Sequence, residues 1–583
     1  HAPIPARVSI PPSDHLSDES RPGTPQSDDL RIDIKKIADK FFVTGSKYAD
    51  FLDSYVQGKL SLPLTTTGIK GLPKVVRRGA DTHESRPNLL FLDLPVPPSS
   101  VGAHPPERFR SNVLLGVIEK KQSQDLPVFG VSGCGKTRSV IEMLCLQWGF
   151  YFNAAKKDLG SNDLSRLAES IEAKAEEDRG VSVNTIFAKN MTLVLFLSRL
   201  LVLKYCLQVP DCRQTFSSAS WAILQACPNM FEDVFSELFN VLFNKLHRRV
   251  PFELDVTTVI QEELLIVRKL LAAHGYPNFS SETKLRLVVD EAQLLSDKGS
   301  ELFQSSFMET GLRPMLSPIL NGFRKAGDRD LTIIYCGTGL SIRTLHWALS
   351  SGEGVKEPRS EMFPYFEFPG WTGRDSIQSY IERVMDQLPD KESKNMLGSL
   401  FPPAAIAMLH ERLTGRFRPV VTAIEGIILR GDPTEWKSEI KYTEAMITSW
   451  KDRERRGNLC GEILRLENKI AQNPKNFTSC SSLRETLGLF LFRYCLLDAT
   501  EIVLEIDVQL VEAAFGRIKI FGGRARTVLD EPFVLKATFN YFQEKDPSLV
   551  SAAERAMLHS DNASVHGNMW EAMMPPVFVE TFK

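Results

Sequence analysis

The residues with the clearest chemistry form a glycine-rich stretch, GVSGCGKT, at positions 130–137. Its spacing, GxxxxGK[ST], stands between a short apolar run and a helical pattern. Glycines let the backbone turn successive amide groups toward an anion, and the helix that follows adds the positive end of its dipole. The sequence therefore predicts a phosphate-binding loop made of Gly130, Val131, Ser132, Gly133, Cys134, Gly135, Lys136 and Thr137.

Two side chains of this loop have specific expected roles. Lys136 would reach the β- and γ-phosphates of a nucleoside triphosphate, and the Thr137 hydroxyl would ligate Mg²⁺. ATP and Mg²⁺ are therefore the expected ligand and cofactor, although the motif does not specify the base. The alternative is a glycine-rich turn between a strand and a helix that binds nothing.

A pair of carboxylates follows a second apolar run. Asp290 and Glu291 end the stretch that begins at Leu285, which has the pattern of a buried strand. Ligands of open α/β sheets bind at the carboxyl ends of strands, so we expect Asp290 to hold the magnesium through water and Glu291 to polarise the attacking water. Acidic residues also favour a helix N-terminus without any catalytic role. Their position after the phosphate loop favours the catalytic interpretation.

Two further polar positions are candidates for sensing the γ-phosphate. Thr338, with Ser341 as the alternative, follows a third apolar run, but these residues also suit a helix cap or a tight turn. Arg418 stands at GxxR spacing from Gly415, and either Arg418 or Arg416 beside it could reach the γ-phosphate from a lid. An arginine there would tie the lid to the nucleotide state, and the alternative is a surface ion pair.

The elements that must position these residues follow from the hydrophobic pattern. From about 110 to 430, strand-like runs alternate with helical patterns, which is typical of an α/β domain with a largely parallel sheet. The expected strands are 126–129, 150–152, 285–290, 331–336 and 365–368. Only helical patterns fill about 155–284, between the second and third strands, so we predict a large helical insertion there.

Composition divides the rest of the chain. We expect a disordered tail over 1–30, a helical segment and proline-rich linker over 31–104, an ATPase core over 105–370, a helical lid over 371–430 and a mainly helical C-terminal region over 431–583. A hairpin is expected about Gly522 and Gly523, in an order compatible with a winged helix. Its basic residues suit either a wing for nucleic-acid phosphates or a solvated hairpin face; they are Arg517, Lys519, Arg524 and Arg526.

Charge and cysteine usage narrow the class of protein. The 70 Lys and Arg nearly balance the 72 Asp and Glu, giving a net charge of −2, so no overall charge attracts nucleic acid or a membrane. The cysteines show no CxxC pair and no zinc spacing, which indicates a reducing compartment. The most apolar stretch contains Arg199 and Lys204, so we expect a buried helix and no membrane contact.

The order of phosphate loop, acidic strand, sensor strand and helical lid resembles AAA+ and STAND ATPases, and implies their type of sheet. The motifs themselves resemble fungal Crinkler-type proteins, most strongly over about 105–430. They are GVSGCGKTRSVIEMLCLQWGFYF, LVVDEAQLL, RPMLSPIL, CGTGLS and HGNMWEAMMPPVFVETF. The resemblance implies an ATPase module that is often joined to a ubiquitin-like header and a nuclease, with many members in nuclei and some secreted as effectors.

Three functions follow from these expectations. No header is recognisable in 1–100, and no nuclease motif of the PD-(D/E)xK type is found. The favoured function is a Mg²⁺-dependent ATPase that serves as a regulatory or mechanical module. The alternatives are a nucleotide-gated switch that recruits partners, and the ATPase part of a DNA-processing nuclease whose catalytic domain lies beyond this chain. ATP and ADP are the expected partners; self-association stays open, and nucleic acid is only weakly indicated.

Overall fold

The computed structural model describes residues 26–558 with internal gaps. The gaps are 67, 76–85, 98–110, 122–124, 157–158, 178–179, 228–230, 248–252, 277–278, 281, 300–301, 305–311, 328–329, 339–363, 456, 473–479, 498–500, 506 and 523. The predicted alternative sensor Ser341 and the motif that starts at His566 therefore lie outside the described residues.

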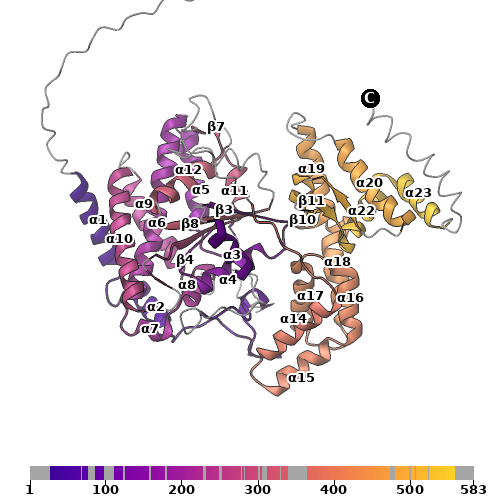
Figure 1. The fold of residues 1–583 in the computed structure, drawn as a ribbon, viewed down its shortest axis with the longest axis horizontal. Coiled ribbons are helices and arrows are strands. Elements are labelled where there is room, and N and C mark those ends of the chain that lie inside the picture. Colours follow the sequence, from indigo (N-terminus) through magenta and orange to yellow (C-terminus); the bar gives the residue numbers. More distant parts are fainter. Residues whose placement is uncertain are drawn as a thin grey trace, which may run out of the picture.

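A parallel sheet organises the first half of the chain (Figure 1). Its strands, in spatial order, are β3 (Asp125–Phe129), β8 (Leu331–Gly337), β5 (Leu285–Asp290) and β4 (Gly149–Asn153). Tyr365 makes a parallel bridge with Val128 on the free side of β3. Four of the predicted runs are thus strands, and the fifth, 365–368, contributes only this bridge. The α/β prediction is confirmed, with the sensor strand between the phosphate-loop strand and the acidic strand.

The predicted helical insertion lies between β4 and β5. Its helices are α5 (Asp163–Glu177), α6 (Val181–Gln208), α7 (Cys212–Thr215), α8 (Ser218–Ala226), α9 (Val234–Leu246) and α10 (Glu253–Ala273). Short α7 and α8 were not predicted. Helix α4 (Lys136–Leu146) follows β3, and β8 is preceded by α11 (Gln293–Ser296), β6 (Phe303–Gln304), β7 (Leu312–Arg313) and α12 (Leu316–Gly327).

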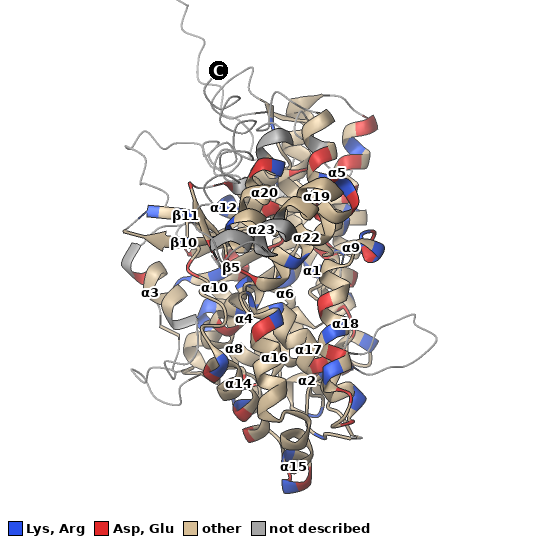
Figure 2. Cartoon of the chain, turned by 90° about the vertical axis from the view of Figure 1, so that its right-hand side faces the viewer, with Lys and Arg blue, Asp and Glu red and all other residues tan. Residues whose placement is uncertain are grey.

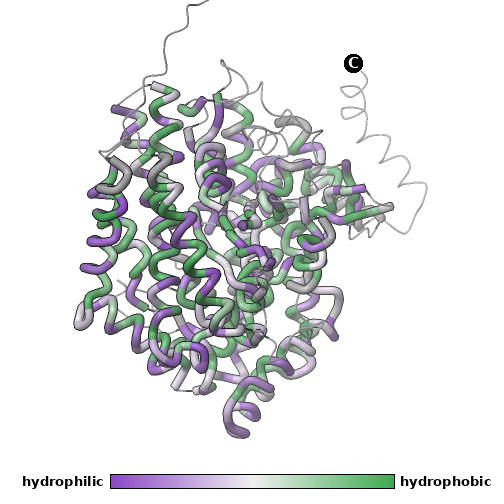
Figure 3. Tube along the Cα trace, turned by 60° about the vertical axis from the view of Figure 1, so that its left-hand side comes forward, coloured by the Kyte–Doolittle hydropathy of each residue, from purple (hydrophilic) through white to green (hydrophobic). Residues whose placement is uncertain are grey.

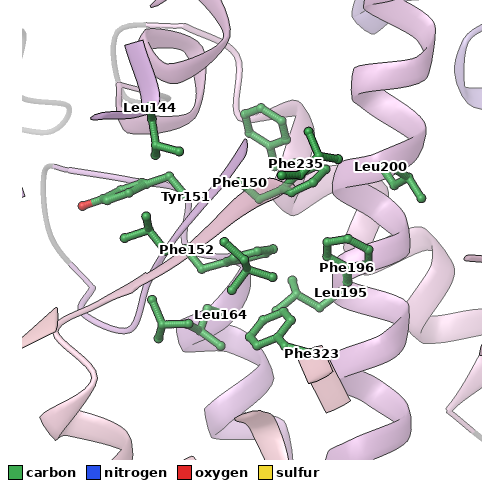
Figure 4. Packing of buried hydrophobic residues seen from close by; sticks show 14 of the residues in the cluster. Leu144, Phe150, Tyr151, Phe152, Leu164, Leu195, Phe196, Leu200, Phe235 and Phe323 are labelled. Atoms are coloured by element: carbon green, nitrogen blue, oxygen red, sulfur yellow. The ribbon is translucent and has the colours of Figure 1, made fainter. Parts of the chain in front are cut away.

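Helix α6 is the centre of this half of the protein. It is long and apolar enough to cross a membrane, yet 89% of its most apolar window is buried inside the protein. Figure 3 shows hydrophobic stretches along the packed helices of the protein. Aromatic rings join α6 and α12 to the sheet: the ring centroid of Phe196 in α6 lies 5.0 Å from that of Phe150 in β4, and the centroid of Phe323 in α12 lies 4.9 Å from that of Phe152 in β4 (Figure 4). The expected buried helix is therefore present.

Arg199, which interrupts the apolar pattern of α6, is fully buried in an ion pair. Its Nε donates to Asp163 Oδ2 at 2.7 Å, and neither side chain is exposed. Its Nη1 donates to Gln225 at 3.2 Å, and the guanidinium lies 4.1 Å from the centroid of the Phe235 ring. Because a buried charge without its partner is costly, this pair fixes how α5 and α6 pack together.

The N-terminal segment packs against two parts of the structure. Helices α1 (Gln26–Phe41) and α2 (Lys47–Val56) pack on the insertion. Helix α1 thus begins inside the predicted tail. Strands β1 (Lys74–Val75) and β2 (Arg86–Pro87), the short helix η1 (Leu89–Phe91) and α3 (Ser111–Lys121) follow. Leu89 and Leu92 are buried with residues of the lid, so this segment spans from the insertion to the lid.

The lid and the C-terminal unit complete the chain (Figure 1). The lid consists of α14 (Arg374–Asp386), α15 (Lys391–Leu400), α16 (Pro403–Leu413) and α17 (Phe417–Arg430). The C-terminal unit consists of α18 (Trp436–Thr448), η2 (Trp450–Asp452), α19 (Leu459–Gln472), α20 (Cys480–Leu497), β9 (Ile502–Leu504), α21 (Val508–Glu512), β10 (Arg517–Phe521), β11 (Arg524–Leu529), α22 (Pro532–Lys545) and α23 (Pro547–Leu558). The predicted hairpin is β10–β11, in an antiparallel sheet of order β10-β11-β9. Charges of both signs alternate over the helices that face the viewer in Figure 2.

Replacing Arg199 with leucine tests the weight of the buried ion pair. The change leaves the Asp163 carboxylate buried without its partner, so we expect a loss of about 3–5 kcal/mol in the free energy of unfolding. The matched control is Arg374→Leu, because Arg374 pairs with Glu411 while 56% of its side chain is exposed. That change should cost under about 1 kcal/mol. Equal losses in chemical denaturation would contradict this account of α6.

Candidate nucleotide-binding site

The phosphate loop folds into a tight turn between β3 and α4. Gly133 and Gly135 have φ values of +84° and +107°, a left-handed conformation that favours glycine. A Cβ at Gly133 would lie 2.7 Å from the Cβ of Arg418, so a side chain is also excluded by space. Inside the turn, Lys136 Nζ donates to the carbonyls of Gly130 at 2.6 Å and Val131 at 3.1 Å. The ammonium group of Lys136 is thus held inside the loop by backbone carbonyls.

Thr137 and Asp290 lie side by side, as a magnesium site requires. Thr137 Oγ1 donates to Asp290 Oδ2 at 2.8 Å, and the Tyr151 hydroxyl donates to the same oxygen at 2.9 Å. Burial, and then the charge of Glu291, raise the pKa of the Asp290 carboxyl above its usual range. Hydroxyl and carboxylate oxygens are the ligands that Mg²⁺ prefers, and a cation would offset the cost of the buried Asp290 charge beside the half-buried Glu291.

Glu291 and Thr338 meet beside this pair. Glu291 has a φ of +54°, an uncommon conformation for a residue with a side chain. Gln293 donates to Glu291 Oε2 at 2.6 Å and accepts from the Thr338 backbone N–H at 3.2 Å. Lys136 Nζ donates to Thr338 Oγ1 at 3.2 Å. The structure therefore brings together the residues predicted to bind phosphate, to polarise water and to sense the γ-phosphate.

The two candidate lid arginines have different surroundings. The Arg418 backbone N–H donates to the Gly133 carbonyl at 3.0 Å, and its side chain is exposed beside the phosphate loop. Arg416 is buried, 5% exposed, and its Nη1 donates to the Ser132 carbonyl at 3.4 Å. Arg418 therefore lies where a lid arginine could meet a phosphate, whereas Arg416 is engaged elsewhere.

The main partner of Arg416 is Glu531 in the C-terminal unit. The Arg416 backbone N–H donates to Glu531 Oε1 at 2.7 Å, its Nε donates to Oε2 at 2.9 Å, and its Nη2 bonds the same carboxylate. Nη2 also donates to the Ala514 carbonyl at 2.7 Å, and the guanidinium lies 5.1 Å from the Phe533 ring centroid. This pair, neither a surface ion pair nor a free lid arginine, joins the phosphate loop, the lid and the C-terminal unit.

A segment before α3 ties the helix of the phosphate loop to the lid. Arg138, next to Thr137, donates to the carbonyls of Leu90, Leu92 and Asp93 at 2.5, 2.7 and 2.8 Å. The Leu89 backbone N–H then donates to Glu425 of α17 at 2.8 Å. Burial raises the pKa of Glu425 to about 7. The lid therefore contacts the core at two places. Arg418 bonds the phosphate loop, and Glu425 bonds the segment that Arg138 holds.

Several of these residues were missed by sequence reasoning. Gln293 stands two residues after Glu291, and a polar residue at this position, at the start of a helix, is a signal for a site residue. Tyr151 was counted only as part of an apolar strand, although its hydroxyl was a signal for a polar partner. No local signal marks Glu531, because its contact with Arg416 spans 115 residues.

The predicted basic wing is mostly neutralised. Arg517 is buried and donates to Asp530 at 2.9 Å, Lys519 lies 2.6 Å from the same carboxylate, and Arg526 pairs with Glu505. Of the four basic residues, only Arg524 lacks a carboxylate partner among the described residues. These pairs favour the structural interpretation of the hairpin over phosphate binding.

Comparisons with known proteins carry no argument for this chain, either about the fold or about the site. No protein-family model matches the chain, and no curated protein matches it. Among solved structures, a Walker-type ATPase of Pyrococcus abyssi is similar at 14% identity and a TM-score of 0.34, over 77% of this chain and 99% of that chain. The chain's own sheet order and phosphate loop show an α/β P-loop fold with helical extensions, and the site is argued from its geometry alone.

The raised pKa of Glu425 predicts a pH-dependent stability. Between the usual carboxyl range and pH 7 the folded state binds more protons than the unfolded state, so stability falls as pH rises through this window. Glu425→Gln keeps the bond from Leu89 and removes the titration. Its unfolding temperature relative to wild type should therefore rise from pH 5 to 7 and then level off. Glu411→Gln, on the exposed face of α16, is the control; a pH-independent difference for Glu425→Gln would contradict the prediction.

Proposed function

We propose that this chain binds ATP with Mg²⁺ and hydrolyses it to ADP and phosphate. One observation carries the proposal: the side chains of Lys136, Thr137, Asp290, Glu291 and Thr338 converge at the carboxyl ends of three adjacent parallel strands. Each has the chemistry that phosphoryl transfer to water requires at its position. A turn that binds nothing would not need a buried lysine, or a buried Asp290 beside a second carboxylate.

The roles of the residues follow from their contacts. Lys136 exchanges the carbonyls of the loop for phosphate oxygens, and Thr137 with Asp290 would hold Mg²⁺, which supplies positive charge to the phosphates. Glu291 accepts a proton from the water whose oxygen attacks the γ-phosphorus, while the bond to the leaving ADP oxygen breaks. Thr338 contacts the γ-phosphate, and Arg418 adds positive charge from the lid.

Two substitutions separate binding from hydrolysis. Lys136→Ala removes the ammonium, so nucleotide affinity should fall at least about tenfold. Glu291→Gln keeps the shape of the site without the base, so ATP should still bind while turnover falls by about 10²-fold or more. Fluorescent-ATP binding and phosphate release would measure the two effects. Unchanged affinity in Lys136→Ala would contradict the proposed nucleotide site. Unchanged turnover in Glu291→Gln would contradict the proposed role of Glu291 as the base.

A second candidate, a nucleotide-gated switch, is favoured by the Arg416–Glu531 pair. Arg416 touches the phosphate loop through Ser132 and holds the C-terminal unit through Glu531. A change of the loop on nucleotide binding or hydrolysis would therefore alter the docking of the C-terminal unit. The same contact serves an ATPase whose turnover moves that unit, so the two candidates differ in the rate of hydrolysis and not in the site.

Removing the charge of Glu531 tests this coupling. Glu531→Gln leaves the Arg416 guanidinium buried without its counter-charge, so the C-terminal unit should undock and the lid should hold nucleotide less firmly. We expect release of a fluorescent ATP analogue to be faster by about tenfold, together with a larger radius of gyration in solution scattering. Glu505→Gln, whose side chain is 85% exposed in its pair with Arg526, is the control. Wild-type values for both quantities in Glu531→Gln would exclude the switch contact.

The proposed family, cellular location and target follow from the sequence motifs. The resemblance to Crinkler-type proteins of fungi supports an ATPase module that works inside cells, in the cytoplasm or nucleus, and that acts on a further protein or on DNA through another domain. The site geometry supports the ATP binding and hydrolysis of this proposal. Stimulation of turnover by double-stranded DNA would favour the DNA-processing alternative.

A further inference from the structure

Gln293 occupies a position between the two residues that must respond to the γ-phosphate. Its Nε2 lies 2.6 Å from Glu291 Oε2, and its Oε1 lies 3.2 Å from the backbone nitrogen of Thr338. Gln293 begins α11 at the end of β5, whereas Thr338 follows β8. The side chain therefore bridges two neighbouring strand ends, one carrying the water-polarising acid and the other the sensor.

The chemistry of both partners fixes the orientation of the amide. A backbone N–H can only donate, so it must face the amide oxygen, and a carboxylate can only accept, so it must face the NH₂ group. Glutamate at 293 would lack the donor and repel Glu291, and asparagine would be one methylene shorter. Among these side chains, only glutamine can complete both bonds over this distance.

The bridge extends to the phosphate loop. Lys136 donates to the Thr338 hydroxyl at 3.2 Å, so the polar contacts run from Lys136 through Thr338 and Gln293 to Glu291. A shift of the end of β8, when Lys136 and the Thr338 hydroxyl turn to a γ-phosphate, would reach the carboxylate through Gln293. Glu291 has a left-handed φ of +54°, a conformation that such a bond helps to hold.

We infer that Gln293 is a positioning residue that couples contact between Thr338 and the γ-phosphate to the placement of Glu291 for water attack. The inference rests on the proposed ATP hydrolysis at this site and assigns the device that makes hydrolysis depend on the third phosphate. Gln293 itself touches no reacting atom. It acts only through Glu291.

The test is a double-mutant cycle on the whole chain, with ATP affinity measured separately. Gln293→Ala and Gln293→Glu should lower kcat by about tenfold or more while the dissociation constant for ATP stays within about threefold of wild type. In the Glu291→Gln background, Gln293→Ala should lower single-turnover hydrolysis no further, because its route of action is already lost. Gln378→Glu, which places the same charge change on exposed α14, should leave kcat unchanged.

Each outcome separates this inference from the proposed function. Failure of the wild type to bind ATP would overturn the nucleotide site itself. ATP binding without turnover would keep the site and overturn the role of Gln293. Wild-type kcat in both Gln293 variants, a loss confined to affinity, or an additional loss in the Glu291→Gln background would each overturn the inference while ATP hydrolysis stands. A thermal unfolding scan of each variant excludes loss of fold as the cause.

Discussion

The candidate site depends on one constraint, the position of β8 between β3 and β5 in the parallel sheet. Parallel strands bring their carboxyl ends to the same edge, so the phosphate loop after β3, the sensor after β8 and the acid pair after β5 must meet there. The hydrogen bond from Thr137 to Asp290 crosses this arrangement, joining segments 153 residues apart. Without β8 between them, Lys136 could not reach Thr338, and Gln293 could not link Glu291 to Thr338.

Charged side chains are buried at this edge of the sheet, and their burial costs free energy. Asp290 is 2% exposed beside a second carboxylate, and its hydrogen bonds from Thr137 and Tyr151 only partly offset the cost of its charge. Lys136 is buried as well, satisfied by carbonyls of its own loop. The lid is held against this loop by Arg416 and Arg418, and Glu531 continues the contact into the C-terminal unit. These contacts give a charge change at the loop a direct route to the lid and to the C-terminal unit.

Sequence reasoning placed the strands and the main site residues because each carries a local signal. An apolar run that ends in Asp290, or a glycine-rich turn before Lys136, predicts its function from a few neighbouring residues. The bridge of Gln293 and the pair between Arg416 and Glu531 have no such signal, because they depend on strand order and on the docking of distant segments. Arg199 shows the same limit: its charge favours a buried helix over a membrane span, but only the fold supplies Asp163 as its partner.

The central claim is that nucleotide bound at this edge of the sheet changes the contact between Arg416 and Glu531 in the C-terminal unit. Amide hydrogen exchange of the whole chain, with and without Mg²⁺ and a non-hydrolysable ATP analogue, tests it directly. The account predicts slower exchange over 131–137 and a simultaneous change near Arg416 and Glu531. Unchanged exchange over 131–137 at saturating analogue would contradict the nucleotide site. Protection of the loop with no change near Glu531 would contradict its coupling to the C-terminal unit.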